Sequence, residues 1–254
     1  MIKVEHLFKF FSLSSAQQKE LGIKTKELSA LTDLSFSCSA GKILMVLGSK
    51  NSGKSTLLGI LATILKPDKG SVQLMGLDLN THAAEIRKHV GFFSANQPFF
   101  EYLTVTEQLE YSAGLKGMTG GMISDRLPVI LEKWHLAAIK NKRISSISAA
   151  EKLLLGIAQS VVHNPRLLLL DEPALGLDLF SAKPVFELVD YAKKDGMTVV
   201  YATNNLSKTE LIGDELIVLH QGRLIHHSSI VDFRNLSEDS LSAAFLSLLH
   251  KAQI

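Results

Sequence analysis

The sequence predicts an α/β fold in which helices cover a largely parallel sheet. From residue 166 onward, strand-like and helix-like segments alternate: RLLLLDE, SAKPVFELVDYAKKDG, TVVYAT, LSKTELIG and DELIVLHQGRLI. Apolar runs that alternate with helices are typical of strands buried on both faces of a parallel sheet. Earlier in the chain, a strand, a glycine-rich loop and a helix follow one another in KILMVLG, GSKNSGKST and STLLGILATIL.

Three N-terminal segments predict further β-strands. Residues 1–11, 34–47 and 71–79 alternate apolar with polar residues, or form short apolar runs, between the turn signals AGK, PDKG and MGLD. Residues 12–30 are polar and charged, and we expect them to form a solvated insertion between two strands rather than a linker between domains.

Residues 104–162 predict an inserted helical subdomain. Apolar residues recur at helical spacing in three segments, TVTEQLEYSAGL, ISDRLPVILEKWHL and AAEKLLLGIAQSVV. The first two open with Thr104 and Ser124, each followed by acidic residues, which is typical of helix N-caps. The tail SEDSLSAAFLSLLHKA predicts one last amphipathic helix with Ser237 as its cap.

The composition excludes several classes of protein. With 27 basic and 25 acidic residues among 254, the net charge of +2 is too small and too evenly spread for a nucleic-acid-binding surface. Cys38 is the only cysteine, which excludes an intramolecular disulfide and a thiolate zinc site and fits a reducing, cytoplasmic setting. No apolar stretch approaches the ~20 residues that span a bilayer, and the N-terminus does not resemble a signal peptide. If the protein works at a membrane, another subunit holds it there.

The segment GSKNSGKST, residues 48–56, has the spacing G-x-x-x-x-G-K-[ST] between a predicted strand and a predicted helix. This context predicts a phosphate-binding loop, because backbone N–H groups and the helix N-terminus attract phosphate. Lys54 supplies a positive charge for the β- and γ-phosphates, and Ser55 offers its hydroxyl to Mg²⁺. The nucleotide-binding residues of the loop are expected to be Gly48, Ser49, Asn51, Ser52, Gly53, Lys54, Ser55 and Thr56. The alternative is a glycine-rich turn that binds nothing.

An acidic pair ends the predicted strand LLLLDEP, residues 167–173. Asp171 stands at the end of the apolar run, where its carboxylate is expected to hold Mg²⁺ through water. Glu172 is expected to polarise the attacking water. Taken alone, the segment fits a strand that ends in a surface acidic turn; together with the phosphate loop, it predicts an ATP site.

Together these segments resemble the ATP-binding subunits of ABC transporters, especially the branch that powers export through small membrane permeases. The resemblance runs nearly from end to end, through VEHLFKFF, GSKNSGKSTLLGILATILKPDKGSVQLMG, YLTVTEQLEYSAGL, HNPRLLLLDEPALGLD, ATNNLSKTELIGDELIVLHQGRLI and SLSAAFLSLL. The N-terminal region is similar to that of sodium-extrusion ATPases, which carry a comparable polar insertion. The resemblance implies one domain over residues 1–254: an antiparallel β subdomain with the phosphate loop (1–95), a helical subdomain (96–162), the rest of the P-loop core (163–230) and a C-terminal helix (231–254).

The resemblance also implies partners and further site residues. In such proteins ATP and Mg²⁺ lie between the phosphate loop of one subunit and the signature loop of a second, and closure drives an attached membrane permease. The chain is therefore expected at the cytoplasmic side of the inner or plasma membrane, held peripherally by a permease. Phe11 matches the aromatic residue that stacks on adenine, with a plain core position as the alternative. Asp178 matches the loop that crosses to the second subunit.

Two motifs depart from the family pattern in their backbone and charge. Asn51 replaces a glycine in the phosphate loop, but asparagine tolerates left-handed backbone geometry. The signature L-S-G-G-Q is here ISAAE, residues 147–151. Ser148 is kept and opens a helix, whereas two alanines add Cβ atoms that hold a partner's nucleotide away, and Glu151 adds negative charge near a triphosphate.

Two more positions depart from the pattern in groups that contact the metal or the γ-phosphate. Ala95 replaces the metal-contacting glutamine, and Gln97 can substitute only if the loop shifts. Asn204 replaces the histidine that contacts the γ-phosphate, and an amide cannot carry a proton or a positive charge. Losing a hydrogen bond to a charged group costs about 1.5 to 3 kcal/mol, or roughly ten- to a hundredfold in rate.

These departures spare the groups expected to hold Mg·ATP and affect those that commit it to hydrolysis. We therefore expect a chain that binds ATP well and hydrolyses it poorly alone. A heterodimer with a catalytically competent paralogue is favoured, and a homodimer with slow turnover is the alternative. Two other classes stay open: a soluble ABC-type ATP-dependent regulator or clamp, and a P-loop kinase or GTPase. The transported substrate is not encoded in this chain, because the membrane subunit selects it.

Overall fold

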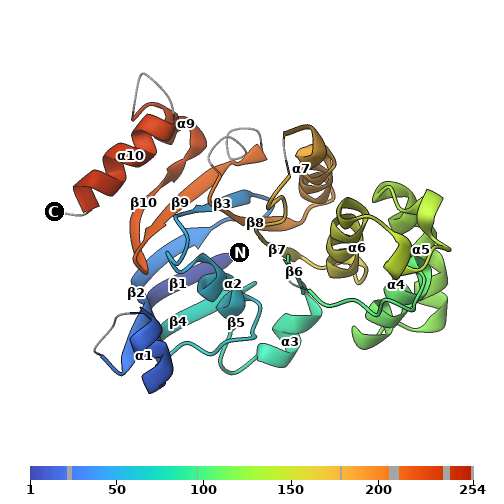
Figure 1. Ribbon diagram of the computed structural model, residues 1–254, viewed down its shortest axis with the longest axis horizontal. Coiled ribbons are helices and arrows are strands. Elements are labelled where there is room, and N and C mark those ends of the chain that lie inside the picture. Colours follow the sequence, from blue (N-terminus) through green and yellow to red (C-terminus); the bar gives the residue numbers. More distant parts are fainter. Residues whose placement is uncertain (22–24, 96, 178, 206–211, 237–240, 253–254) are drawn as a thin grey trace.

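Two β-sheets with helices packed around them make up the fold (Figure 1). The computed structural model describes residues 1–21, 25–95, 97–177, 179–205, 212–236 and 241–252. Within these residues, one sheet has four strands and the other has six. The predicted α/β class, with a P-loop core and flanking helices, is confirmed.

The four-stranded sheet is antiparallel and has the order β2-β1-β4-β5. Its strands are β1 (Ile2–Ser12), β2 (Glu27–Cys38), β4 (Lys69–Leu74) and β5 (Leu77–Asp78). Phe11 pairs with Leu28, so the end of β1 lies beside the start of β2. Residues of this strand pair, Phe11 and Leu28 among them, line one end of the candidate site.

The six-stranded sheet has the order β10-β9-β3-β8-β7-β6. Its strands are β3 (Ile43–Leu47), β6 (Val90–Ser94), β7 (Leu167–Asp171), β8 (Thr198–Thr203), β9 (Glu215–His220) and β10 (Arg223–Ser229). All neighbours pair in parallel except β9 and β10. Because parallel strands end at the same edge of a sheet, the loops that follow β3, β6, β7 and β8 come together there.

Helices cover both faces of the six-stranded sheet. Successive residues of β3 point to opposite faces, so they pack in two different cores. Ile43, Met45 and Leu47 pack in a core that also holds apolar residues of α6 (Ala149–Val161) and α7 (Leu179–Lys194). Leu44 and Val46 pack in a second core, shared with α2 (Lys54–Leu61) and the four-stranded sheet. The near-continuous apolar sequence of β3 follows from this burial on both faces.

The helical part lies beside β6 and β7 (Figure 1). It consists of α4 (Val105–Leu115), α5 (Gly120–Lys133), α6 and two 3₁₀ turns, Ala137–Ile139 and Ile144–Ser146. The predicted cap of α4 is confirmed: Thr104 and Glu107 form a reciprocal capping box. The remaining short helices are α1 (Ser15–Leu21), α3 (Ala83–Lys88), α9 (Ile230–Arg234) and α10 (Leu241–Ala252).

Residues 34–47 hold the end of β2 and all of β3, and the predicted turn AGK separates the two strands, where Gly41 has a φ of +71°. Two other predicted boundaries are wrong, each for a local reason. The insertion expected over 12–30 is shorter, because β2 already begins at Glu27, and it contains α1. The strand expected within DELIVLHQGRLI is a hairpin, since Gln221 and Gly222 both have positive φ, as two-residue hairpin turns require.

One helix cap is also wrong. Thr119 occupies the N-cap position of α5, whereas Ser124 lies inside the helix and donates its hydroxyl to the carbonyl of Gly121. Such back-bonding satisfies a serine within a helix, so the acidic residue after Ser124 was a misleading signal. The predicted helix LSKTELIG lies largely outside the described residues, as does the cap Ser237.

Cys38 is expected to resist alkylation in the folded protein. Its side chain is buried in the core shared by the two sheets, and burial, with the negative charge of Glu215, raises the pKa of the thiol to about 12. The thiolate is the reactive form, so iodoacetamide at about pH 8 should leave the native protein unmodified. Mass spectrometry should find a single label after unfolding in urea. Native labelling as fast as that of the unfolded chain would contradict this burial.

Candidate nucleotide site

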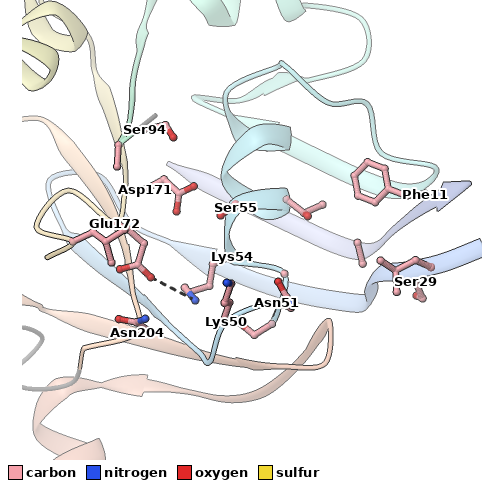
Figure 2. Close-up of a pocket in the computed structure, with 17 residues that line it drawn as sticks. Phe11, Ser29, Lys50, Asn51, Lys54, Ser55, Ser94, Asp171, Glu172 and Asn204 are labelled. Carbon is pink, nitrogen blue, oxygen red and sulfur yellow. Dashed lines mark ion pairs between the residues drawn. The ribbon is translucent and has the colours of Figure 1, made fainter. Parts of the chain in front are cut away.

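A pocket of about 770 Å³ opens where β3, β6, β7 and β8 end. The loop between β3 and α2 lines its middle, residues that end or follow β6, β7 and β8 line one end, and residues of β1 and β2 line the other (Figure 2). Of the residues predicted from the sequence, it brings together Phe11, Asn51, Ser52, Gly53, Lys54, Ser55, Thr56, Asp171, Glu172 and Asn204. Gly48 and Ser49 belong to the same loop but do not line the pocket, and Ser148, at the start of α6, does not line it either.

The backbone of the phosphate loop explains its residue types. A Cβ on Gly48 would lie 2.2 Å from Oγ of Ser52 and 2.5 Å from the carbonyl oxygen of Leu219, so only glycine fits there. Asn51 has a φ of +65° and Gly53 a φ of +102°, both in the left-handed region. Asparagine is among the few side chains that adopt this geometry readily, so the loop keeps its turn without a glycine at position 51.

Lys54 is buried at the start of α2 and is held by the loop itself. Its Nζ donates to the carbonyl oxygens of Gly48 and Ser49, at 2.8 and 3.0 Å, and lies 3.7 Å from Oε1 of Glu172. Burial lowers the pKa of Lys54, while Glu172 and then Asp171 raise it. The opposing carboxylates therefore help to keep a positive charge in the centre of the loop.

Asp171 fits a magnesium ligand. It ends β7, and its Oδ1 is buried without a hydrogen-bond partner among the described residues. Burial raises the pKa of Asp171, whereas a hydrogen bond with the Ser55 side chain and the charge of Lys54 lower it. A buried carboxylate oxygen that lacks a donor, beside a hydroxyl, is the kind of oxygen pair that Mg²⁺ prefers.

Glu172 follows Asp171 in a strained conformation. Its φ is +49°, and its backbone N–H donates to the carbonyl oxygen of Ala202 on β8. Burial raises the pKa of its carboxyl, and the charge of Lys54 and hydrogen bonds from Thr203 and the backbone of Asn204 lower it. Left-handed geometry in a residue other than glycine costs free energy and is frequent at functional sites. The carboxylate is thereby directed into the pocket, next to Lys54 (Figure 2).

Phe11 lies at the opposite end of the pocket from Glu172 (Figure 2). Its ring is only partly buried, and Nζ of Lys9 lies 5.4 Å from the ring centre. Leu28 and Ser29 of β2 line the pocket next to it. Leu28 and Ser29 were not among the expected site residues, because the amino-acid sequence does not reveal which strand pairs with the end of β1.

The chain has an alanine where the family pattern places a metal-contacting glutamine. Ala95 lines the pocket, and Gln97 does not. Instead, Nε2 of Gln97 donates to Oε1 of Gln159 on α6 at 3.3 Å, and Gln159 in turn donates to Ser112 on α4. Gln97 is thus engaged with the helical part and does not supply the missing glutamine contact to the pocket.

Asn204 lies just after β8 and lines the pocket at the Glu172 end. Its side chain is exposed, and its backbone N–H donates to the carboxylate of Glu172. The position therefore faces the same part of the pocket as Glu172, with an uncharged amide. Asp178, which matches the loop expected to cross to a second subunit, lies outside the described residues.

The signature segment forms hydrogen bonds internally, in a capping box between Ser148 and Glu151. Ser148 caps α6, and Oε2 of Glu151 accepts hydrogen bonds from both the backbone N–H and the hydroxyl of Ser148, each at 2.7 Å. These bonds, the hydroxyl's first, lower the pKa of Glu151. Glu151 is therefore more than the opposing charge expected from the sequence, and the spacing S-x-x-E is the signal that predicts this capping box. A carboxylate already occupies the helix N-terminus where the family pattern expects a partner's phosphate.

The chain matches a protein-family model and several known proteins. The family model described as ABC transporter matches residues 31–175. The ABC transporter ATP-binding protein NatA of Bacillus subtilis is 25% identical over 228 residues, which are 89% of this chain and 93% of that protein. The mouse cholesterol transporter ABCA5 is 32% identical over 83% of this chain, but the chain spans only 13% of that longer protein.

Solved structures have the same fold. An ATP-binding subunit of an ABC transporter superposes with a TM-score of 0.81 at 23% identity and covers 98% of this chain and 99% of its own. A dimeric ATP-binding cassette in a post-hydrolysis state, bound to ADP and phosphate, superposes with a TM-score of 0.78 at 23% identity, over 91% of this chain and 99% of its own.

Proposed function

Since the chain belongs to the ABC transporter family as an ATP-binding domain, we propose that it binds Mg·ATP in this pocket, at a dimer interface, and couples binding to a membrane permease. The observation that carries the proposal is Oδ1 of Asp171, which is buried beside Ser55 and has no hydrogen-bond partner in the part of the chain that the structure describes. A glycine-rich turn without a ligand has no need of a buried carboxylate oxygen that lacks a donor.

The residues of the pocket divide the work of holding the nucleotide. The backbone N–H groups at the start of α2 have no partner within the helix and are free to bind phosphate oxygens. Lys54 bridges the loop and the phosphates, and Asp171 and Ser55 would hold Mg²⁺, which would neutralise part of the phosphate charge. Phe11 stacks on the base at the other end of the pocket. Glu172 orients and polarises the attacking water.

Hydrolysis by the isolated chain is slow in this proposal. Ala95 offers no metal contact, Gln97 is engaged elsewhere, and Asn204 supplies neither a proton nor a charge. In the second half of a composite site, Glu151 competes with the phosphate of a partner for the N-terminus of α6. The groups that hold Mg·ATP are retained, so binding and turnover are affected unequally.

The retained ATP-binding groups and the altered hydrolysis groups together favour a heterodimer. A paralogue with an intact signature loop would close over the ATP of this chain, while the Ser148–Glu151 segment would close loosely over the ATP of the paralogue. A slowly turning homodimer is the alternative arrangement. We propose an export-type transporter on the resemblance of the N-terminal region to sodium-extrusion ATPases, and we place the chain at the cytoplasmic face of the membrane, held by its permease. None of the helices that the structure describes is long and apolar enough to cross a membrane.

The test is affinity purification of the tagged chain from solubilised native membranes, with mass spectrometry of the proteins recovered. We expect a membrane permease and a second ATP-binding subunit in stoichiometric amounts. Recovery of the chain without any permease, in the cytosolic fraction or with ribosomes, would overturn the transport assignment in favour of a soluble ATP-dependent regulator. Transfer of phosphate from ATP to an acceptor, or a preference for GTP, would instead indicate a P-loop kinase or GTPase.

A further inference from the structure

We propose that Lys50 is a second phosphate-binding lysine of this loop and that it makes the pocket prefer a nucleoside triphosphate to a diphosphate. This inference rests on the proposed function, because it assigns a residue and a selectivity to the same site. Lys50 lies between β3 and α2, its side chain is exposed, and it lines the pocket. The loop motif itself specifies no residue type at this position.

The two lysines of the pocket differ in their surroundings. Among the described lining residues, Lys50 and Lys54 are the only basic ones. Lys54 is buried, and its ammonium group is held by two backbone carbonyls and lies near Glu172. Lys50 forms no ion pair within the part of the chain that the structure describes. Its ammonium group is therefore available to an anion in the pocket, without a protein contact to break first.

The charges around the pocket leave a role for this second cation. The two lining carboxylates, Asp171 and Glu172, lie at the same end as Lys54, and Glu172 offsets part of the charge of Lys54. Asn204 lies at that end as well and is uncharged. A terminal phosphate placed there adds negative charge close to two carboxylates, and a free ammonium group reduces that repulsion.

The position of Lys50 along the pocket gives the selectivity. In Figure 2 Lys50 is drawn between Lys54 and Asn51, nearer to the Glu172 end of the pocket than to Phe11. With the base at Phe11, the phosphates extend along the loop toward Asp171 and Glu172, so the last phosphate of a triphosphate approaches this end most closely. A diphosphate is one phosphate shorter and loses this contact, while the backbone of the loop still binds it.

The experiment is calorimetric titration of Mg·ATP and Mg·ADP into the purified full-length chain and its variants. Lys50→Gln removes the charge and keeps most of the side chain, Lys50→Arg keeps the charge, and Lys66→Gln is the matched control, an exposed lysine beyond α2 that does not line the pocket. We expect Lys50→Gln to weaken ATP binding about tenfold, the lower range for a hydrogen bond to a charged group. ADP binding should change little, and the other two variants should bind like the wild type.

Two results would overturn the role of Lys50: unchanged ATP affinity in Lys50→Gln, or an equal loss for ATP and ADP. Thermal denaturation of each variant without nucleotide shows whether the fold is intact, and an exposed loop lysine is expected to leave it so. Failure of the wild-type chain to bind any nucleotide would refute the proposed function instead. The two hypotheses therefore fail in different ways.

Discussion

Lys54→Ala is expected to weaken Mg·ATP binding by roughly a hundredfold or more, because each hydrogen bond lost from a charged group costs about 1.5 to 3 kcal/mol. Lys54 is the cation that the loop holds in its centre, bonded to the carbonyls of Gly48 and Ser49. In the presence of a triphosphate, the same ammonium group would bridge the loop and the phosphates. Calorimetric titration with Mg·ATP measures the loss.

The matched control for this variant is Lys66→Ala, since Lys66 is exposed and does not line the pocket. Removing Lys54 also leaves Glu172 without its cation, so the thermal stability of the nucleotide-free variant must be followed in parallel. ATP affinity equal to that of the wild type, in a variant that remains folded, would show that the phosphate loop has been wrongly assigned.

Replacing the residues that depart from the family pattern with the usual ones is expected to increase the rate of ATP hydrolysis. The signature variant Ala149→Gly/Ala150→Gly/Glu151→Gln frees the start of α6 from its internal carboxylate, and Asn204→His supplies a group that can be protonated at the Glu172 end. In a dimer, the two changes act on one composite site from opposite subunits. We expect the combined variant to hydrolyse ATP at least about tenfold faster than the wild type, and faster than the two single effects predict, because residues that act as a unit are not additive.

Phosphate release at saturating ATP measures these rates, with Asn205→His as the matched control beside the pocket. Each glycine in the first turn of α6 lowers helix stability by up to about 1 kcal/mol, so unfolding temperatures are needed to separate a folding loss from a catalytic one. A combined variant that is folded, dimeric in ATP and no faster than the wild type would mean that these positions do not limit turnover.

The sequence predicts the parallel core and the phosphate loop well, because both depend on local patterns. The loop motif needs a fixed spacing of glycines and a lysine between a strand and a helix, and β3 is apolar throughout and β7 is apolar up to Asp171. The predicted boundaries fail at turns. At Gln221 and Gly222, two residues with positive φ reverse the chain, so that one predicted strand is the hairpin of β9 and β10.

Long-range contacts account for what the sequence does not predict at the site. Gln97 donates a hydrogen bond to Gln159, which lies far along the chain, and it does not line the pocket. This contact depends on the packing of the helices and cannot be inferred from the local sequence. Leu28 and Ser29 join Phe11 through the register of β1 and β2. The capping box of Ser148 and Glu151 is the exception, because its spacing is local and visible in the sequence.

One measurement bears most directly on the central claim that this chain holds Mg·ATP but rarely hydrolyses it alone. The purified wild-type chain, in excess over radiolabelled ATP with Mg²⁺, is separated from free nucleotide at successive times, and the bound ATP and ADP are quantified. We expect most of the label to remain bound as ATP for minutes, far longer than the fraction of a second that an enzyme with a median turnover of about 10 s⁻¹ requires. Rapid conversion of the bound label to ADP and phosphate by the isolated chain would contradict the claim.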